Sequence, residues 1–173
     1  RLLHAFPTRL SSDLYLEQLI IEGNAPWMVW ESGKGGGGIS HAGGNMHKVI
    51  VSGAGGFIGS ALVKELAANG ITVAALGHSG QPDGIADHPL VTWHPFSMEH
   101  TLQLEERLGE RDFDTFYHLA WAGSAGEGRA DTALQMQNAA WAADCVRLAK
   151  RLGCSRFVMA GSIMELEAVR ASF

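Results

Sequence analysis

Three glycines at equal spacing, Gly53, Gly56 and Gly59, give the clearest indication of a ligand-binding site in this sequence. An apolar stretch centred on residues 49–51 precedes them, and apolar residues at helical spacing follow them. A strand, a tight turn and a helix N-terminus in this order form a cradle for a diphosphate, because backbone N–H groups and the helix dipole face the anion. Gly53 would permit the turn, Gly56 the approach of the diphosphate, and Gly59 the packing of helix on strand.

The surroundings of these glycines make the pattern specific. Residues 35–38 are also glycines, but neither a strand pattern nor a helix pattern flanks them. Position 58 is Ile, so the spacing is G-x-x-G-x-x-G rather than G-x-G-x-x-G. We therefore expect residues 53–59 to bind the diphosphate of a nicotinamide dinucleotide, and an ordinary strand-turn-helix connection is the alternative.

The residues after the second expected strand bear on the choice between NAD and NADP. Many dinucleotide-binding domains place a carboxylate there to hold the adenosine ribose, but this chain has Gly77, His78 and Ser79, and its first carboxylate is Asp83. His78 or Ser79 could donate a hydrogen bond to a 2′-phosphate, which favours NADP. No arginine stands at this point of the sequence, so both cofactors stay open.

Three later segments of the sequence also contain candidate site residues, two at the ends of expected strands and one inside an expected helix. His118, Leu119 and Ala120 end the fourth strand pattern, and a packed histidine is the simplest interpretation of His118. Asn138 is polar within an alanine-rich helix and could be either exposed or functional. Ser162 follows the fifth strand pattern, where a hydroxyl can stabilise a developing charge or merely belong to a turn.

The elements that must position these residues alternate along the chain. Apolar runs predict strands at 49–51, 71–76, 90–93, 113–119 and 156–160, and helical spacing predicts helices at 57–69, 98–108 and 131–152. This alternation predicts an α/β fold with a Rossmann-type, doubly wound parallel sheet, whose ligands bind beyond the carboxyl ends of the strands.

Composition narrows the functional classes. The chain has 173 residues and a net charge of -5, so nucleic-acid binding is not expected. No apolar run has the length of a membrane helix, and no signal peptide is recognised. Cys145 and Cys154 show no metal-binding spacing, and the eight histidines form no metal motif. We expect a cytoplasmic protein with reduced thiols and no metal site.

The first 45 residues differ in character from the rest, and we treat 1–45 as extraneous or linker and 46–173 as the dinucleotide-binding domain. Residues 1–14 resemble translated adapter DNA. Residues 15–31, through Gly-x-Ala-Pro-Trp-x-x-Trp, resemble the C-terminal end of glucose-1-phosphate cytidylyltransferases. Residues 33–45 form a glycine-rich linker. Either two sugar-nucleotide enzymes are fused, or the end of an upstream gene is read through into a gene that starts at Met46. We favour the read-through.

Four motifs taken in order resemble the extended short-chain dehydrogenase/reductase family, the NAD(P)-dependent epimerase/dehydratase group. They are Ser52-Gly53-x-x-Gly56-x-x-Gly59, His118-Leu119-Ala120, Asn138 and Phe157-Val-Met-Ala-Gly-Ser162, and the resemblance covers 46 to about 167. It implies hydride exchange between a nicotinamide and a nucleotide sugar, and dimerisation of the intact protein through a helix that includes 131–152. It also implies site residues: diphosphate contacts from Gly53, Gly56, Phe57, Ile58 and Gly59, a ribose lining from Leu119 and Ala120, support of the active-site water network by Asn138, and catalysis by Ser162.

Departures from the family pattern limit this expectation. Family members often have an aspartate after the third strand that holds the adenine, but residues 93–96 of this chain, Trp-His-Pro-Phe, contain none. Leu166 stands where a tyrosine is usual. The family's Tyr-x-x-x-Lys pair is absent, since Tyr15 and Tyr117 are the only tyrosines. We therefore expect the cofactor-binding half of an enzyme, cut before its substrate lobe and inactive alone. A non-catalytic dinucleotide sensor and a reductase of non-sugar ketones are the alternatives.

Overall fold

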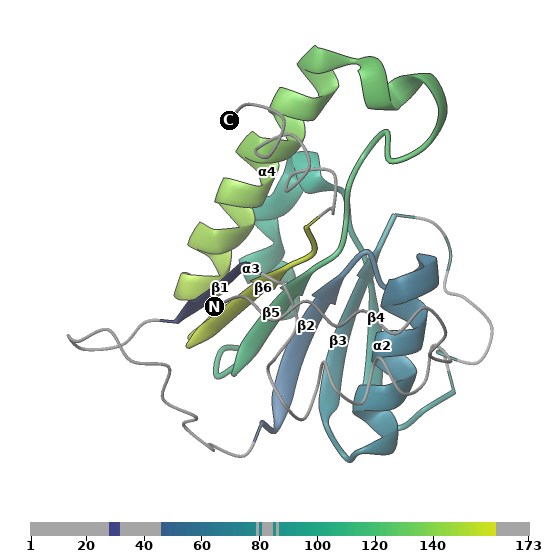
Figure 1. Ribbon diagram of the computed structural model, residues 1–173. Coiled ribbons are helices and arrows are strands. Elements are labelled where there is room, and N and C mark those ends of the chain that lie inside the picture. The colour runs from purple at the N-terminus through teal and green to yellow at the C-terminus, as the bar shows by residue number, and fades with distance from the viewer. Residues whose placement is uncertain (1–27, 32–45, 79, 81–84, 86, 162–173) are drawn as a thin grey trace, which may run out of the picture.

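In a computed structural model of the chain, the described residues form a six-stranded sheet with helices on both faces (Figure 1). The structure describes residues 28–31, 46–78, 80, 85 and 87–161. The strands lie in the order β1-β6-β5-β2-β3-β4, and every neighbouring pair except β1 with β6 is parallel. The α/β, doubly wound sheet predicted from the alternation of strand and helix patterns is confirmed.

The parallel strands are short, and the central residues of all but the edge strand β4 are buried because helices cover both faces. Their bounds are β2 (Lys48–Ser52), β3 (Thr72–Gly77), β4 (Val91–Pro95), β5 (Thr115–His118) and β6 (Arg156–Met159). From β2 the chain runs outward to β3 and β4, and it then returns to place β5 on the other side of β2. This reversal between β2 and β5 is the point where ligands bind in such sheets.

Of the helices in the described residues, α2 (Phe57–Ala68) covers one face of the sheet. It packs its buried residues Leu62, Val63 and Leu66 against β2 and β3. It ends at Asn69, and Gly70 follows with φ 80°, as the Asn-Gly stop predicts. Ile58, which falls on the same apolar stripe in the sequence, is instead 49% exposed because it lies in the first turn, at the edge of the sheet.

The other face carries η1 (Met98–Gln103), α3 (Leu104–Leu108) and α4 (Thr132–Arg151). Leu104, Leu148 and Phe116 belong to the apolar cluster on this side. The sequence predicts one helix over 98–108, but the structure contains a 3-10 segment followed by a short α-helix. His100 has non-helical backbone angles (φ -113°, ψ 25°), which kinks the chain inside η1, ahead of α3.

Two further elements are not predicted by the sequence patterns. A 3-10 turn, η2 (Gly126–Ala130), precedes α4. Strand β1 (Met28–Glu31) belongs to the segment treated as extraneous or linker, and it pairs antiparallel with β6, with Met28 opposite Met159 and Glu31 opposite Arg156. An antiparallel edge strand is common on an otherwise parallel sheet.

Candidate functional site

The glycine turn after β2 is closely packed against the residues that follow β5. Gly53 has φ 74°, and a Cβ built on it would lie 2.7 Å from the backbone carbon of Leu119 and 2.7 Å from the nitrogen of Ala120. A Cβ at Gly59 would lie 2.1 Å from the Gly53 oxygen. The fold itself therefore requires glycine at 53 and 59, as the sequence predicts for the turn and for the helix–strand contact.

Gly56 differs from these two glycines because the fold leaves space beside it. The nearest atom to a Cβ at Gly56 is the Gly53 oxygen at 3.3 Å, a contact that small shifts can accommodate. Gly56 is the N-cap of α2, and no side chain caps the helix there. The first N–H groups of an α-helix have no partner within it, so this N-terminus presents donors and the positive end of the dipole.

A cavity of about 350 Å³ extends from this turn along the carboxyl ends of the strands. It brings together Gly53, His78 and Ala120, which were predicted from separate parts of the sequence. The remaining lining residues are Gly77, Phe96, Ser97, Met98, Glu99, Trp121, Ala122 and Trp141. The cavity lies at the topological switch point, where an extended dinucleotide crosses the edge of a parallel sheet.

The other predicted cofactor residues lie nearby but do not line this cavity. Phe57 is 89% exposed, and Phe57, Ile58 and Gly59 form the first turn of α2. Leu119 is half-buried and packs against the α2-side core. Phe57, Ile58 and Gly59 present backbone groups at the helix N-terminus, and Leu119 directly precedes Ala120. Their cofactor contacts stay predictions.

Asn138 is fully buried in α4, so the interpretation that it is merely exposed is wrong. Its side-chain Nδ2 donates to the Ala122 carbonyl over 2.8 Å, and its Oδ1 accepts from the Ala122 N–H over 2.9 Å. Trp121 is fixed similarly, since its indole N–H donates to Gln135 Oε1 over 2.8 Å. These bonds hold the segment after β5 against α4, on one wall of the cavity.

His118 is 1% exposed, which confirms the interpretation of a packed histidine at a strand end. Its Nδ1 lies 2.9 Å from the Ser52 hydroxyl, and its ring stacks on Phe157 with centroids 5.9 Å apart. Burial lowers the pKa of His118 to about 4, so the imidazole is neutral near pH 7. His118 therefore supports the strand ends rather than carrying charge into the cavity.

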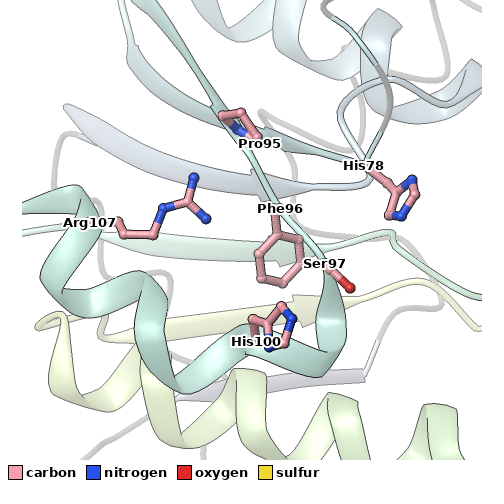
Figure 2. A pocket seen from close by; sticks show the side chains of 6 residues that line it. All are labelled: His78, Pro95, Phe96, Ser97, His100 and Arg107. Atoms are coloured by element: carbon pink, nitrogen blue, oxygen red, sulfur yellow. The ribbon is translucent and has the colours of Figure 1, made fainter.

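A second, smaller cavity of about 240 Å³ adjoins the first, and the two share His78, Phe96 and Ser97 (Figure 2). Its other walls come from Pro95, His100 and Arg107. The sequence patterns did not indicate Ser97, His100, Arg107 or Trp141, and they marked Phe96 only as part of 93–96, where the family often has an aspartate. Only the fold brings η1, α3 and α4 to this edge.

The described part of the chain offers little for other chemistries. No group of three His, Cys, Asp or Glu side chains among those residues is placed to hold a metal ion. Within the same residues no helix is long and apolar enough to cross a membrane.

Burial raises the pKa of both Cys145 and Cys154 to about 12, so neither thiol is a nucleophile at neutral pH. Ser162 lies outside the described residues, and its catalytic role stays a prediction.

Comparison with known proteins agrees with this geometry. The model of the NAD dependent epimerase/dehydratase family matches residues 49–170. No curated protein matches the chain. Among solved structures, Bordetella bronchiseptica WbmH in complex with NAD⁺ shares 23% identity over 63% of this chain and 37% of its own, with a TM-score of 0.52.

Two other solved structures give a similar result. The epimerase Mth375 of Methanothermobacter thermautotrophicus shares 22% identity over 69% of this chain and 36% of its own, with a TM-score of 0.56. The Thermotoga maritima UDP-glucose 4-epimerase with UDP-glucose shares 19% identity over 62% and 35%, with a TM-score of 0.52. At these identities the likeness shows the fold, and the matched part of this chain spans between 35% and 37% of the three structures.

Proposed function

Because the chain belongs to the NAD dependent epimerase/dehydratase family, we propose that it binds a nicotinamide dinucleotide across the cavity at the carboxyl ends of β2 and β5. We further propose that it is the cofactor-binding part of an enzyme that acts on a nucleotide sugar. The observation that carries this proposal is the junction of Gly53 with Leu119 and Ala120, because it places the glycine turn, the α2 N-terminus and the cavity at one edge.

The residues present fit such a cofactor. The backbone N–H groups at the start of α2 would bind the diphosphate, since neither a cationic side chain nor a side-chain cap occupies that position in the described turn. Gly53 and Ala120 would form the floor, and Asn138 would hold Ala122 and the wall beside it. When bound, the nicotinamide would supply the acceptor or donor of a hydride at a sugar carbon.

The proposal that the substrate is a nucleotide sugar is supported by two resemblances rather than by the geometry of the site. The Thermotoga maritima relative in fold was solved with UDP-glucose, and residues 15–31 resemble the end of an enzyme that makes a CDP-sugar. Within this proposal Ser162 would hydrogen-bond a sugar oxygen on which charge develops, since in the sequence it comes shortly after β6, which ends at Met159.

Calorimetric titration of the chain with NADH and NADPH tests the cofactor site. We expect binding of at least one of them, and we expect Gly56→Val to weaken it by about tenfold or more, equivalent to about 1.4 kcal/mol. The variant adds bulk where the diphosphate would lie but displaces little of the protein, since only one atom approaches that Cβ closely. Gly80→Ala is the matched control, because nothing lies within 4 Å of its Cβ. Unchanged affinity in Gly56→Val would reject the proposed site.

A further inference from the structure

The two outer edges of the sheet are protected in different ways. At one edge, Pro89 precedes β4 and Pro95 ends it. Proline lacks the backbone N–H that a pairing strand would need, and it is one of the residues with which natural sheets protect an edge. At the other edge, β6 contains neither proline nor lysine, and β1 lies beside it instead (Figure 1).

Strand β1 is short and has a single neighbour in the sheet. It has four residues, and within the described chain it pairs with no strand other than β6. Val29 lies opposite Val158, and the pairing is antiparallel although the five other strands run parallel to one another. The edge of β6 therefore accepts an antiparallel strand. Because a four-residue strand at an edge makes few hydrogen bonds, its detachment requires little free energy compared with unfolding of the sheet.

The backbone amides of β6 face its two neighbours in alternation. The N–H groups of Arg156 and Ala160 donate to backbone carbonyls on the β5 side, over 3.2 and 3.3 Å. Successive amides of a strand point in opposite directions within the sheet, so the N–H groups of Phe157 and Met159 point to the outer edge. Strand β1 lies opposite both residues. Without β1, these two amides would be open to another strand.

The β6 strand of a second copy of the chain fits this edge. Two β6 strands related by a two-fold axis perpendicular to the sheet run antiparallel, which is the orientation in which the edge accepts β1. With Val158 on the axis, Phe157 of each copy lies opposite Met159 of the other. Each outward N–H then faces a carbonyl of the second strand, because both residues have their backbone groups on the outer side. The second β6 would thus take the register that β1 holds, with Val158 in the position of Val29.

From these observations we propose that the outer edge of β6 is a self-association edge, which β1 occupies within the same chain and thereby keeps the protein monomeric. Release of β1 exposes the edge, and it then pairs with β6 of a second copy by strand addition. Residues 28–31 therefore have a role in the folded domain, although the sequence patterns place them in the segment treated as extraneous or linker. The inference is independent of the proposed function, since no β6 residue lines either cavity.

Sedimentation velocity of the 173-residue chain and its variants tests this inference. The wild-type chain should be a monomer. Trp30→Pro removes the β1 amide opposite Phe157 and should raise the sedimenting mass about twofold, to that of a dimer. Val29→Pro is the matched control, because its N–H points away from β6 and edge strands tolerate proline at such positions. This control should remain a monomer. Circular dichroism establishes that each variant is folded.

Glu31→Lys is a milder variant that decides the question if Trp30→Pro does not fold. Glu31 lies opposite Arg156, and like charges directly opposite one another destabilise a strand pair. This variant should dimerise at a concentration at which the wild-type chain is still a monomer.

A double variant, Trp30→Pro with Met159→Pro, identifies the surface that associates. Proline at 159 removes an outward donor of β6 and none of the N–H groups that face β5, so the double variant should return to the monomer. A double variant that stays dimeric overturns the inference, since association would then use another surface. Folded Trp30→Pro and Glu31→Lys chains that stay monomeric overturn it as well. A wild-type dimer that Trp30→Pro dissociates would show that β1 pairs with β6 of a second copy, which contradicts capping within one chain.

Discussion

The Ser52 hydroxyl and His118 Nδ1 lie 2.9 Å apart, at paired positions where β2 and β5 both end. The other ring nitrogen of His118, Nε2, is buried and has no hydrogen-bond partner among the described residues. A protonated imidazole would place a second N–H donor in this apolar surrounding, beside Phe157. Protonation of His118 is therefore unfavourable in the folded chain, and the imidazole at this junction of the two strands is neutral near pH 7.

The first prediction follows from the lowered pKa of His118. The folded-state pKa is about 4 and the ordinary value is 6.5, so between them the unfolded chain binds more protons than the folded one. The free energy of unfolding should therefore fall as the pH is lowered from 6.5 towards 4, by on the order of 3 kcal/mol in all. Urea denaturation at about pH 7 and about pH 5 measures the larger part of this loss, about 2 kcal/mol.

His118→Gln should abolish most of that pH dependence, whatever its effect on stability near neutral pH. His94 stays in this variant, and its lowered pKa should leave a residual slope of the same sign. If the wild-type chain and His118→Gln lose the same free energy of unfolding between the two pH values, the buried neutral histidine is not the cause.

A second prediction concerns the junction of the glycine turn with the end of β5. Gly53 and Gly70 both have positive φ, at 74° and 80°, but nothing lies within 4 Å of a Cβ at Gly70. Gly70→Ala should lower the free energy of unfolding by about 1–2 kcal/mol from backbone strain alone. Gly53→Ala should lower it by a further amount of about 1–3 kcal/mol, because the new Cβ clashes with Leu119 and Ala120. Equal destabilisation of Gly53→Ala and Gly70→Ala in urea would show that this close contact is not formed.

A third prediction concerns the two hydrogen bonds between the Asn138 side chain and the Ala122 backbone. Asn138→Ala removes both and should lower the free energy of unfolding by about 2 kcal/mol. Gln137→Ala, one position earlier on the exposed face of α4, should change it by less than about 0.5 kcal/mol. Amide hydrogen exchange at Ala122 gives an independent measure, since its N–H should exchange faster only in Asn138→Ala. Similar stability and exchange in the two variants would contradict this role.

The sheet and its glycine turn could be predicted from the sequence because their determinants are local. Apolar runs, the Asn69-Gly70 stop and the spacing of Gly53, Gly56 and Gly59 depend on neighbouring residues. Arg107 could not be assigned to the site, because its position there depends on how η1 and α3 fold back over β4. The kink at His100 and the antiparallel pairing of β1 with β6 are tertiary outcomes for the same reason.

A fourth prediction is that the 173-residue chain binds its cofactor without turning over substrate. Neither tyrosine has a lysine four residues later, since Leu19 and Trp121 stand there. Tyr117 is also unsuited to proton transfer, because burial raises its pKa. Incubation with NAD, NADP and UDP-glucose, followed by chromatography of the sugar nucleotide, should yield no altered sugar. A new sugar nucleotide formed at an enzyme-like rate would refute this.

Amide chemical-shift mapping by NMR tests the central claim most directly, because it locates the dinucleotide on the described chain. Titration with NADPH or NADH should shift the amides of 53–59, His78 and 119–122 most strongly, since these border the turn and the larger cavity. Amides on the exposed outer face of α4, such as those of Gln137 and Ala140, should stay unchanged. Shifts confined to that face, or no shifts around Gly53 at saturating cofactor, would contradict the assignment of this edge as the cofactor site.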